Sequence, residues 1–169
     1  MRDQTDALLR TAAIGVAAGM RSQLPLALLS LAARRDRGRL NLPNTLSSPI
    51  VATFLLAAAA GEFLVDKLPV TPSRLMPGSL VVRAGIGGLA GALLVRRSGL
   101  PPAAGATLGA VGALVGSYAG HDVRAGLVAA TGLPDPLFAV LEDVTAVAIG
   151  AYAVELIGQP GREDATRSR

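Results

Sequence analysis

The chain has 169 residues and no cysteine, so it offers neither a disulfide framework nor a thiolate metal site. Apolar residue types make up 51% of it and charged residues 17%, against roughly 25% charged residues in an ordinary soluble domain. The formal net charge is +4, but the cations lie between apolar runs, where they act as orientation signals. The composition therefore indicates a membrane protein with no nucleic-acid partner.

Five apolar segments emerge along the chain with a window of ~19 residues. They cover residues 7–33, 49–68, 80–95, 103–120 and 136–157. A spanning helix needs about 20 residues, so the later segments suit single spans, the third with its flanks. The first segment is too long for a straight span, and Pro25 inside it removes a backbone hydrogen bond.

The sequence therefore predicts an all-α fold, a polytopic membrane helix bundle of about five hydrophobic helices with a broken or kinked first helix. Residues 1–158 form a single transmembrane domain in this interpretation, and residues 159–169 form a flexible polar C-terminal tail. Whether the first segment crosses the membrane fully or re-enters it is left open.

Cations in the connecting segments predict the orientation of the bundle. With five spans, nine of them fall on one side of the membrane: Arg34, Arg35, Arg37, Arg39, Arg96, Arg97, Arg162, Arg167 and Arg169. The positive-inside rule then places the N-terminus outside and the C-terminus in the cytoplasm.

The fourth apolar segment carries glycines along one helical face. Their spacings are four, three, four and four residues, at Gly105, Gly109, Gly112, Gly116 and Gly120. In membranes, such small-residue faces let helix backbones approach closely. We expect packing within the chain, with the seam of a homo-oligomer as the alternative.

Charged side chains within the apolar segments are the strongest indication of a functional site. A charge at mid-bilayer costs at least ~2.5–3.5 kcal/mol on insertion scales, so it normally faces a partner or a wet cavity. Opposite charges at one depth suggest a paired cluster in the outer half of the membrane. For Lys67, Arg83 and Arg10, snorkelling to the interface is the alternative. The candidate binding residues are Arg21, Ser22, Glu62, Asp66, Lys67, Arg83, Arg124, Glu142 and Asp143.

The stretch GMRSQLP, residues 19–25, places Arg, Ser and Gln beside a proline inside an apolar run. Interrupted helices expose backbone groups and dipole ends, and transporters use these ends as binding sites near the midplane. The alternative is a bent helix with snorkelling polar groups.

Three motifs resemble one known family. They are AAGMRS (17–22), GEFLVDKLPVTPSRL (61–75) and LEDVTAVAIG (141–150). The chain is similar through them to the domain of unknown function 4126 family of small bacterial multi-spanning membrane proteins. The resemblance implies a bacterial inner-membrane location but supplies no activity. It supports functional interest in Arg21, Ser22, Glu62, Asp66, Lys67, Pro69, Arg74, Arg83, Glu142 and Asp143.

We therefore expect a membrane protein that transports or binds a small solute, ion or lipid headgroup at a buried charged site. The expected partners are the lipid bilayer, that ligand and further copies of the chain. A scaffolding protein with internal ion pairs is one alternative. A lipid-active enzyme using Glu62 and Asp66 is another. The sequence assigns no catalytic residue, metal ligand or cofactor.

Overall fold

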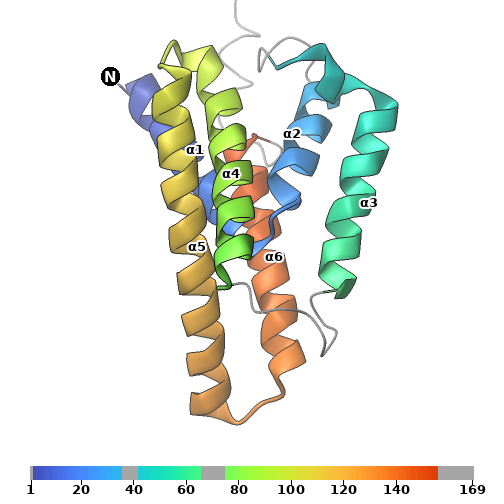
Figure 1. Ribbon diagram of the computed structural model, residues 1–169, viewed down its shortest axis with the longest axis vertical. Coiled ribbons are helices and arrows are strands. Elements are labelled where there is room, and N and C mark those ends of the chain that lie inside the picture. Colours follow the sequence, from blue (N-terminus) through green and yellow to red (C-terminus); the bar gives the residue numbers. More distant parts are fainter. Residues whose placement is uncertain (1, 36–41, 66–74, 156–169) are drawn as a thin grey trace, which may run out of the picture.

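The computed structural model describes residues 2–35, 42–65 and 75–155, and these ranges are helical apart from short connections (Figure 1). The described residues form six α-helices, where the sequence predicted about five. They are α1 (Arg2–Met20), α2 (Leu24–Arg35), α3 (Pro49–Val65), α4 (Pro77–Leu94), α5 (Pro102–Thr131) and α6 (Asp135–Ala153), with the 3₁₀ turns η1 (Asn44–Ser47) and η2 (Val95–Ser98).

Three of these helices, α4, α5 and α6, are long and apolar enough to cross a membrane. The apolar part of α3, Pro49–Leu64, is shorter. Large apolar side chains on these helices face outward, among them Phe54, Val115 and Val144. Such outward apolar faces are typical of a membrane helix bundle, because lipid rather than water surrounds its middle.

The first predicted segment consists of two helices. α1 ends at Met20 and α2 begins at Leu24. Pro25 is the second residue of α2, where its missing N–H costs no hydrogen bond. In a continuous helix its ring would clash with the carbonyl of Arg21. The chain therefore leaves the helical path before the proline rather than at it.

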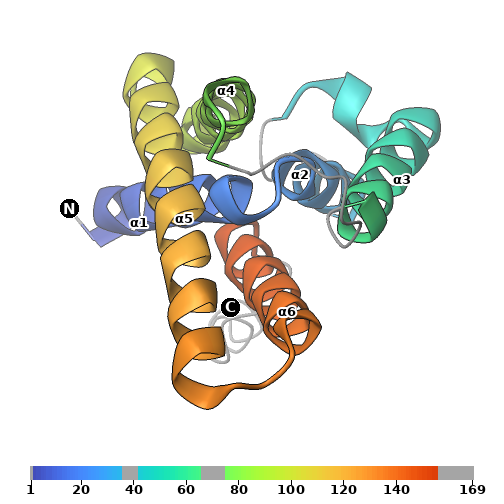
Figure 2. The ribbon, with the colours of Figure 1, turned by 60° about the horizontal axis from the view of Figure 1, so that its bottom comes forward.

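α1 and α2 form a helical hairpin that enters the bundle and returns, as the contacts of α6 show. Arg21 bonds to Asp143, near the middle of α6. Further along α6, a Cβ on Gly150 would lie 2.4 Å from Cδ1 of Leu28 in α2 and 3.6 Å from Cβ of Ala17 in α1. Gly150 of α6 thus lies against both helices of the hairpin, and residues 21–23 form the hairpin tip (Figures 1 and 2).

The glycine face of α5 packs against α1 on one side and α4 on the other. A Cβ on Gly109 would lie 2.1 Å from the carbonyl oxygen of Gly87 in α4, and one on Gly116 would lie 2.3 Å from that of Val16 in α1. Both distances leave no room for any side chain. The predicted close helix contact is confirmed, and it lies within the chain.

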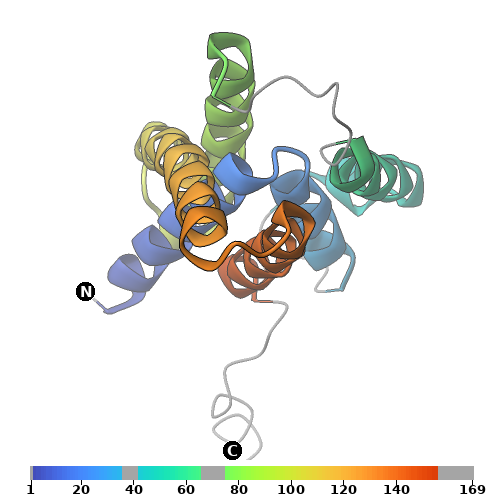
Figure 3. The same cartoon turned by 90° about the horizontal axis from the view of Figure 1, so that it is seen from below.

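The helix α3 stands at the edge of the bundle, beside α2 (Figures 1 and 3). It packs mainly on α2 and η1. The hydroxyl groups of Ser30 and Ser47 join α2 to η1, at 2.6 Å from the carbonyl of Leu46 and 3.3 Å from that of Ala33. The last turns of α3 then carry Glu62 back to the hairpin tip.

Candidate functional site at the hairpin tip

Arg21 is a fully buried cation, with 1% of its surface exposed. Its Nε donates to Oδ1 of Asp143 at 2.7 Å, and Nη2 bonds to the same carboxylate. The guanidinium carbon lies 5.5 Å from the centroid of the Phe63 ring, within range of a cation–π contact. A buried charge is tolerated only with such partners, since its desolvation costs several kcal/mol.

Glu62 of α3 closes the N-terminal end of α2. Its Oε1 accepts hydrogen bonds from the backbone N–H of Ser22 at 2.8 Å and from Oγ of Ser22 at 2.9 Å, and Oε2 accepts one from the N–H of Gln23 at 2.8 Å. The first N–H groups of a helix have no partner inside it and carry partial positive charge. Ser22 and Gln23 immediately precede α2, so Glu62 binds backbone donors at the N-terminal end of α2 from another helix.

Arg83 of α4 neutralises the other broken end, the C-terminus of α1. Its Nη1 donates to the carbonyl of Gly19 at 2.8 Å, and Oγ of Ser117 donates to the same carbonyl at 3.1 Å. The last carbonyls of a helix carry partial negative charge, which a cation stabilises. Nη2 of Arg83 also lies 3.4 Å from Oε1 of Glu62, so the charges on the two helix ends are themselves paired.

The predicted charges Arg124 and Glu142 form a second cluster with Asp135, between α5 and α6. Nε of Arg124 donates to Oδ1 of Asp135 at 2.7 Å, Nη2 bonds to the other oxygen, and Nη1 lies 3.6 Å from Oε2 of Glu142. Glu142 and Asp143 are neighbours on α6, but successive residues of a helix diverge by about 100°. They therefore serve different clusters, where the sequence suggested one.

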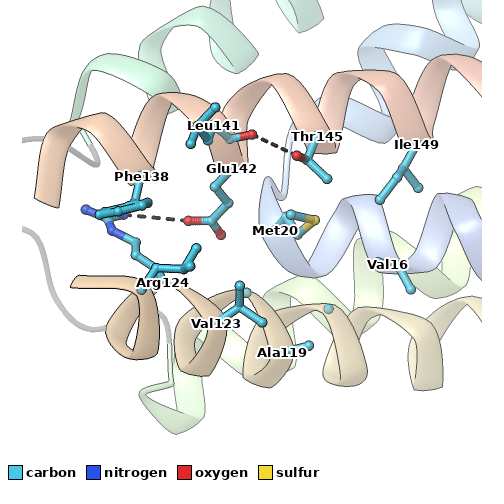
Figure 4. A pocket seen from close by; sticks show the side chains of 13 residues that line it. Val16, Met20, Ala119, Val123, Arg124, Phe138, Leu141, Glu142, Thr145 and Ile149 are labelled. Atoms are coloured by element: carbon cyan, nitrogen blue, oxygen red, sulfur yellow. Dashed lines mark hydrogen bonds and ion pairs between the residues drawn. The ribbon is translucent and has the colours of Figure 1, made fainter. Parts of the chain in front are cut away.

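Two hollows accompany these clusters. α1, α5 and α6 surround a cavity of about 310 Å³, with Arg124 and Glu142 in its wall (Figure 4). A more open groove of about 480 Å³ is lined by Phe63 of α3 and by residues of α6, including Asp143. The groove therefore leads to the Arg21–Asp143 pair of the hairpin tip.

The structure brings Arg21, Ser22, Glu62, Arg83 and Asp143 together at the tip, and places Arg124 and Glu142 in the second cluster. Asp66 and Lys67, like Pro69 and Arg74, lie outside the described residues.

Arg83 and Arg10 are enclosed by the protein, at 5% and 4% exposed. Arg10 donates to Asp6 at 2.7 Å and to the carbonyl of Tyr152 at 3.0 Å.

Sequence reasoning missed two side chains of these clusters. Ser117 adjoins Gly116 within the glycine face, and its hydroxyl serves the broken end of α1. Asp135 lies between two prolines at the start of α6, which is a usual place for an acidic residue. Its position in the LPDP motif predicts a helix N-terminus. No neighbouring residue in the sequence identifies Arg124 as its partner.

Residues 8–156 match the family described as a domain of unknown function (DUF4126), and the chain belongs to this family. The resemblance carried by the three motifs is thereby confirmed. No curated protein and no solved structure matches the chain.

Proposed function

We propose that this chain is a multi-pass protein of the bacterial inner membrane that binds or passes a small solute, ion or lipid headgroup at the hairpin tip. One observation carries the proposal: two helix ends lie side by side within the bundle, each neutralised by a charge from another helix. Secondary transporters present the ends of discontinuous helices to substrates and ions in this way. The binding residues are Arg21, Ser22, Glu62, Arg83 and Asp143.

The Glu62 carboxylate occupies the place that an anionic group of a ligand would take. It receives two backbone N–H bonds, a hydroxyl bond and the Arg83 guanidinium. A ligand carboxylate or phosphate can use the same donors once Glu62 withdraws. In this proposal Glu62 withdraws together with α3, which packs mainly on α2 and η1.

A scaffolding role is the second candidate, because the charged side chains at the tip are already paired with one another. Among the described residues, every buried polar side-chain atom has a partner. Apolar side chains would brace the bundle at lower cost, however, since buried ion pairs seldom repay their desolvation. The groove that reaches Asp143 favours a working site. A lipid-active enzyme has less support, since Glu62 is committed to the end of α2 and to Arg83.

We further propose that both termini are cytoplasmic. The outside N-terminus was expected on the basis of five spans, whereas α1 and α2 form a hairpin. Arg10, near the middle of α1, contacts Tyr152 near the end of α6, so the first half of α1 lies toward that end of the bundle. Arg34 and Arg35 end α2 at the same end of the bundle, near the upper edge of Figure 1. The positive-inside rule assigns this end to the cytoplasm.

Thiol labelling tests whether water and solutes reach the tip. The chain has no cysteine, so Gln23→Cys introduces a single thiol while keeping the backbone bond to Glu62. In proteoliposomes we expect this thiol to react with a small cationic methanethiosulfonate reagent. Leu29→Cys, at a position 0% exposed in α2, is the unreactive control. Equal, negligible labelling of both variants would identify a dry scaffold instead.

A further inference from the structure

The cavity between α1, α5 and α6 is elongated, and it is separate from the hairpin tip, whose five residues do not line it. Its lining residues recur every three or four positions, from Gly116 to Leu127 on α5 and from Phe138 to Ile149 on α6 (Figure 4). Such spacing defines one face of each helix. Each face extends over about 16 Å, at the rise of ~1.5 Å per residue of an α-helix. The volume of about 310 Å³ is therefore distributed along some three turns of both helices.

The arrangement of α1 and the small residues of α5 keep this space open. Val16 and Met20 of α1 lie between α5 and α6 at one end of the cavity (Figure 4). Along α5, the wall includes Gly116, Ala119 and Gly120, whose side chains are too small to fill the space. The cavity is therefore part of how the three helices pack.

The wall of the cavity is mainly apolar, and its polar side chains already have partners. Thr145 donates to the carbonyl of Leu141 at 2.8 Å, and Arg124 and Glu142 belong to the second charged cluster. A cavity water needs about two to four polar partners, whereas an apolar cavity of ~150 Å³ stays dry and takes up benzene. Apolar wall atoms without neighbours also lose dispersion contacts. The cavity is therefore suited to an apolar ligand.

The mouth of the cavity lies on the outer surface of α5 and α6. Val123, Leu127 and Leu141 line the cavity and are also exposed. Both helices are long and apolar enough to cross a membrane, so this mouth meets hydrocarbon in a bilayer. An acyl chain can then enter sideways without crossing water.

We propose that the cavity binds one acyl chain of a membrane lipid, lying lengthwise between α5 and α6. The headgroup lies toward the short connection between these helices, and the methyl end of the chain lies toward Met20. A compact apolar molecule would fill only part of this length. The site is thus a lipid-binding site distinct from the hairpin tip.

A single tryptophan tests whether a lipid chain reaches the buried wall. The chain contains no tryptophan, so Phe138→Trp introduces one reporter at a cavity position that is 7% exposed. In vesicles of phosphatidylcholine with brominated acyl chains, we expect strong quenching, because bromine quenches tryptophan fluorescence only at close range. Acrylamide, a water-soluble quencher, should have little effect. Leu137→Trp, at the neighbouring exposed position, gives the quenching level for bulk lipid.

Ala119→Phe fills the cavity without changing a charge. Ala119 lines the cavity and is exposed, so the larger side chain fits at small cost to folding. Ala129→Phe, at an exposed position of α5 outside the cavity, is the matched control. In the Phe138→Trp background, the first variant should lose most of the bromine quenching and the second should keep it.

Native mass spectrometry of the full-length chain gives a measurement that needs no tryptophan. We expect one phospholipid to remain bound to the unaltered chain and to the Ala129→Phe protein, but not to the Ala119→Phe protein. Equal retention by all three, or quenching of the Phe138→Trp reporter by acrylamide in place of brominated lipid, would overturn the proposal. Bromine quenching that disappears as the protein-to-lipid ratio rises would assign the cavity to a second copy of the chain and overturn it as well.

Discussion

Arg21 and Asp143 are joined by a 2.7 Å hydrogen bond, although 122 positions separate them in the sequence. The pair attaches the hairpin tip to the middle of α6. Both side chains are largely removed from the surroundings, at 1% and 14% exposed. Their interaction is therefore screened little by solvent, and removal of one partner takes a charge-assisted bond from the other buried charge.

Asp143→Asn is accordingly expected to destabilise the protein strongly. Breaking a buried pair by removing one partner costs about 3–5 kcal/mol. The exchange of charges in Arg21→Asp with Asp143→Arg should recover part of that loss. Thermal unfolding in detergent measures both effects, with Asp122→Asn at an exposed position of α5 as control. An unchanged unfolding temperature for Asp143→Asn would mean that the pair does not hold the hairpin.

Two glycines of α5 should respond to alanine with opposite signs. A Cβ at Gly109 would lie 2.1 Å from the carbonyl oxygen of Gly87, so Gly109→Ala must separate α4 from α5. At Gly126 no atom lies within 4 Å of a new Cβ, and alanine is the better helix former by about 0.8–1.0 kcal/mol. Gly109→Ala should lower the unfolding temperature and Gly126→Ala should raise it. Two equal shifts would show that close packing does not determine stability here.

Reporter fusions test the proposed orientation. A reporter that is active only in the periplasm should be silent when fused before Met1 or after Arg169. It should be active when inserted at Gly132, between α5 and α6. Periplasmic activity at the N-terminal fusion alone would restore the five-span topology and contradict the returning hairpin.

The sequence predicts the long helices and the glycine contact well, because both depend on local periodicity. Apolar runs reveal α4, α5 and α6, and the spacing of Gly105 to Gly116 reveals a packing face. The break before Pro25 was also visible as a motif. The direction of the chain after the break could not be predicted, because a chain that stops being helical can continue onward or turn back. Only the packing of both limbs against Gly150 settles that choice.

Charge partners could not be predicted from the sequence for a related reason. Glu142 and Asp143 look like one acidic site, yet adjacent positions on a helix point in different directions. Which arginine each one meets depends on where α1 and α5 lie around α6. Arg21 meets one and Arg124 the other.

Glu62→Gln separates the proposed binding site from a scaffold. The amide keeps one oxygen for Ser22, but its NH₂ group opposes the N–H of Gln23, and Arg83 loses a carboxylate. Loss of these charge-assisted bonds costs about 1.5–3 kcal/mol, enough to raise the open population of the tip by about tenfold or more. In a Gln23→Cys background, thiol labelling should accelerate by that factor.

In that experiment, Glu155→Gln is the control, because Glu155 contacts Arg10, outside the hairpin tip. A working site also predicts that a small carboxylate or inorganic phosphate, added at high concentration, slows labelling in the Glu62→Gln protein by occupying the vacated donors. If the tip only braces the bundle, neither anion affects the rate, and Glu62→Gln lowers the unfolding temperature without faster labelling. That second pattern would remove Glu62 from the binding site and leave it a structural cap of α2.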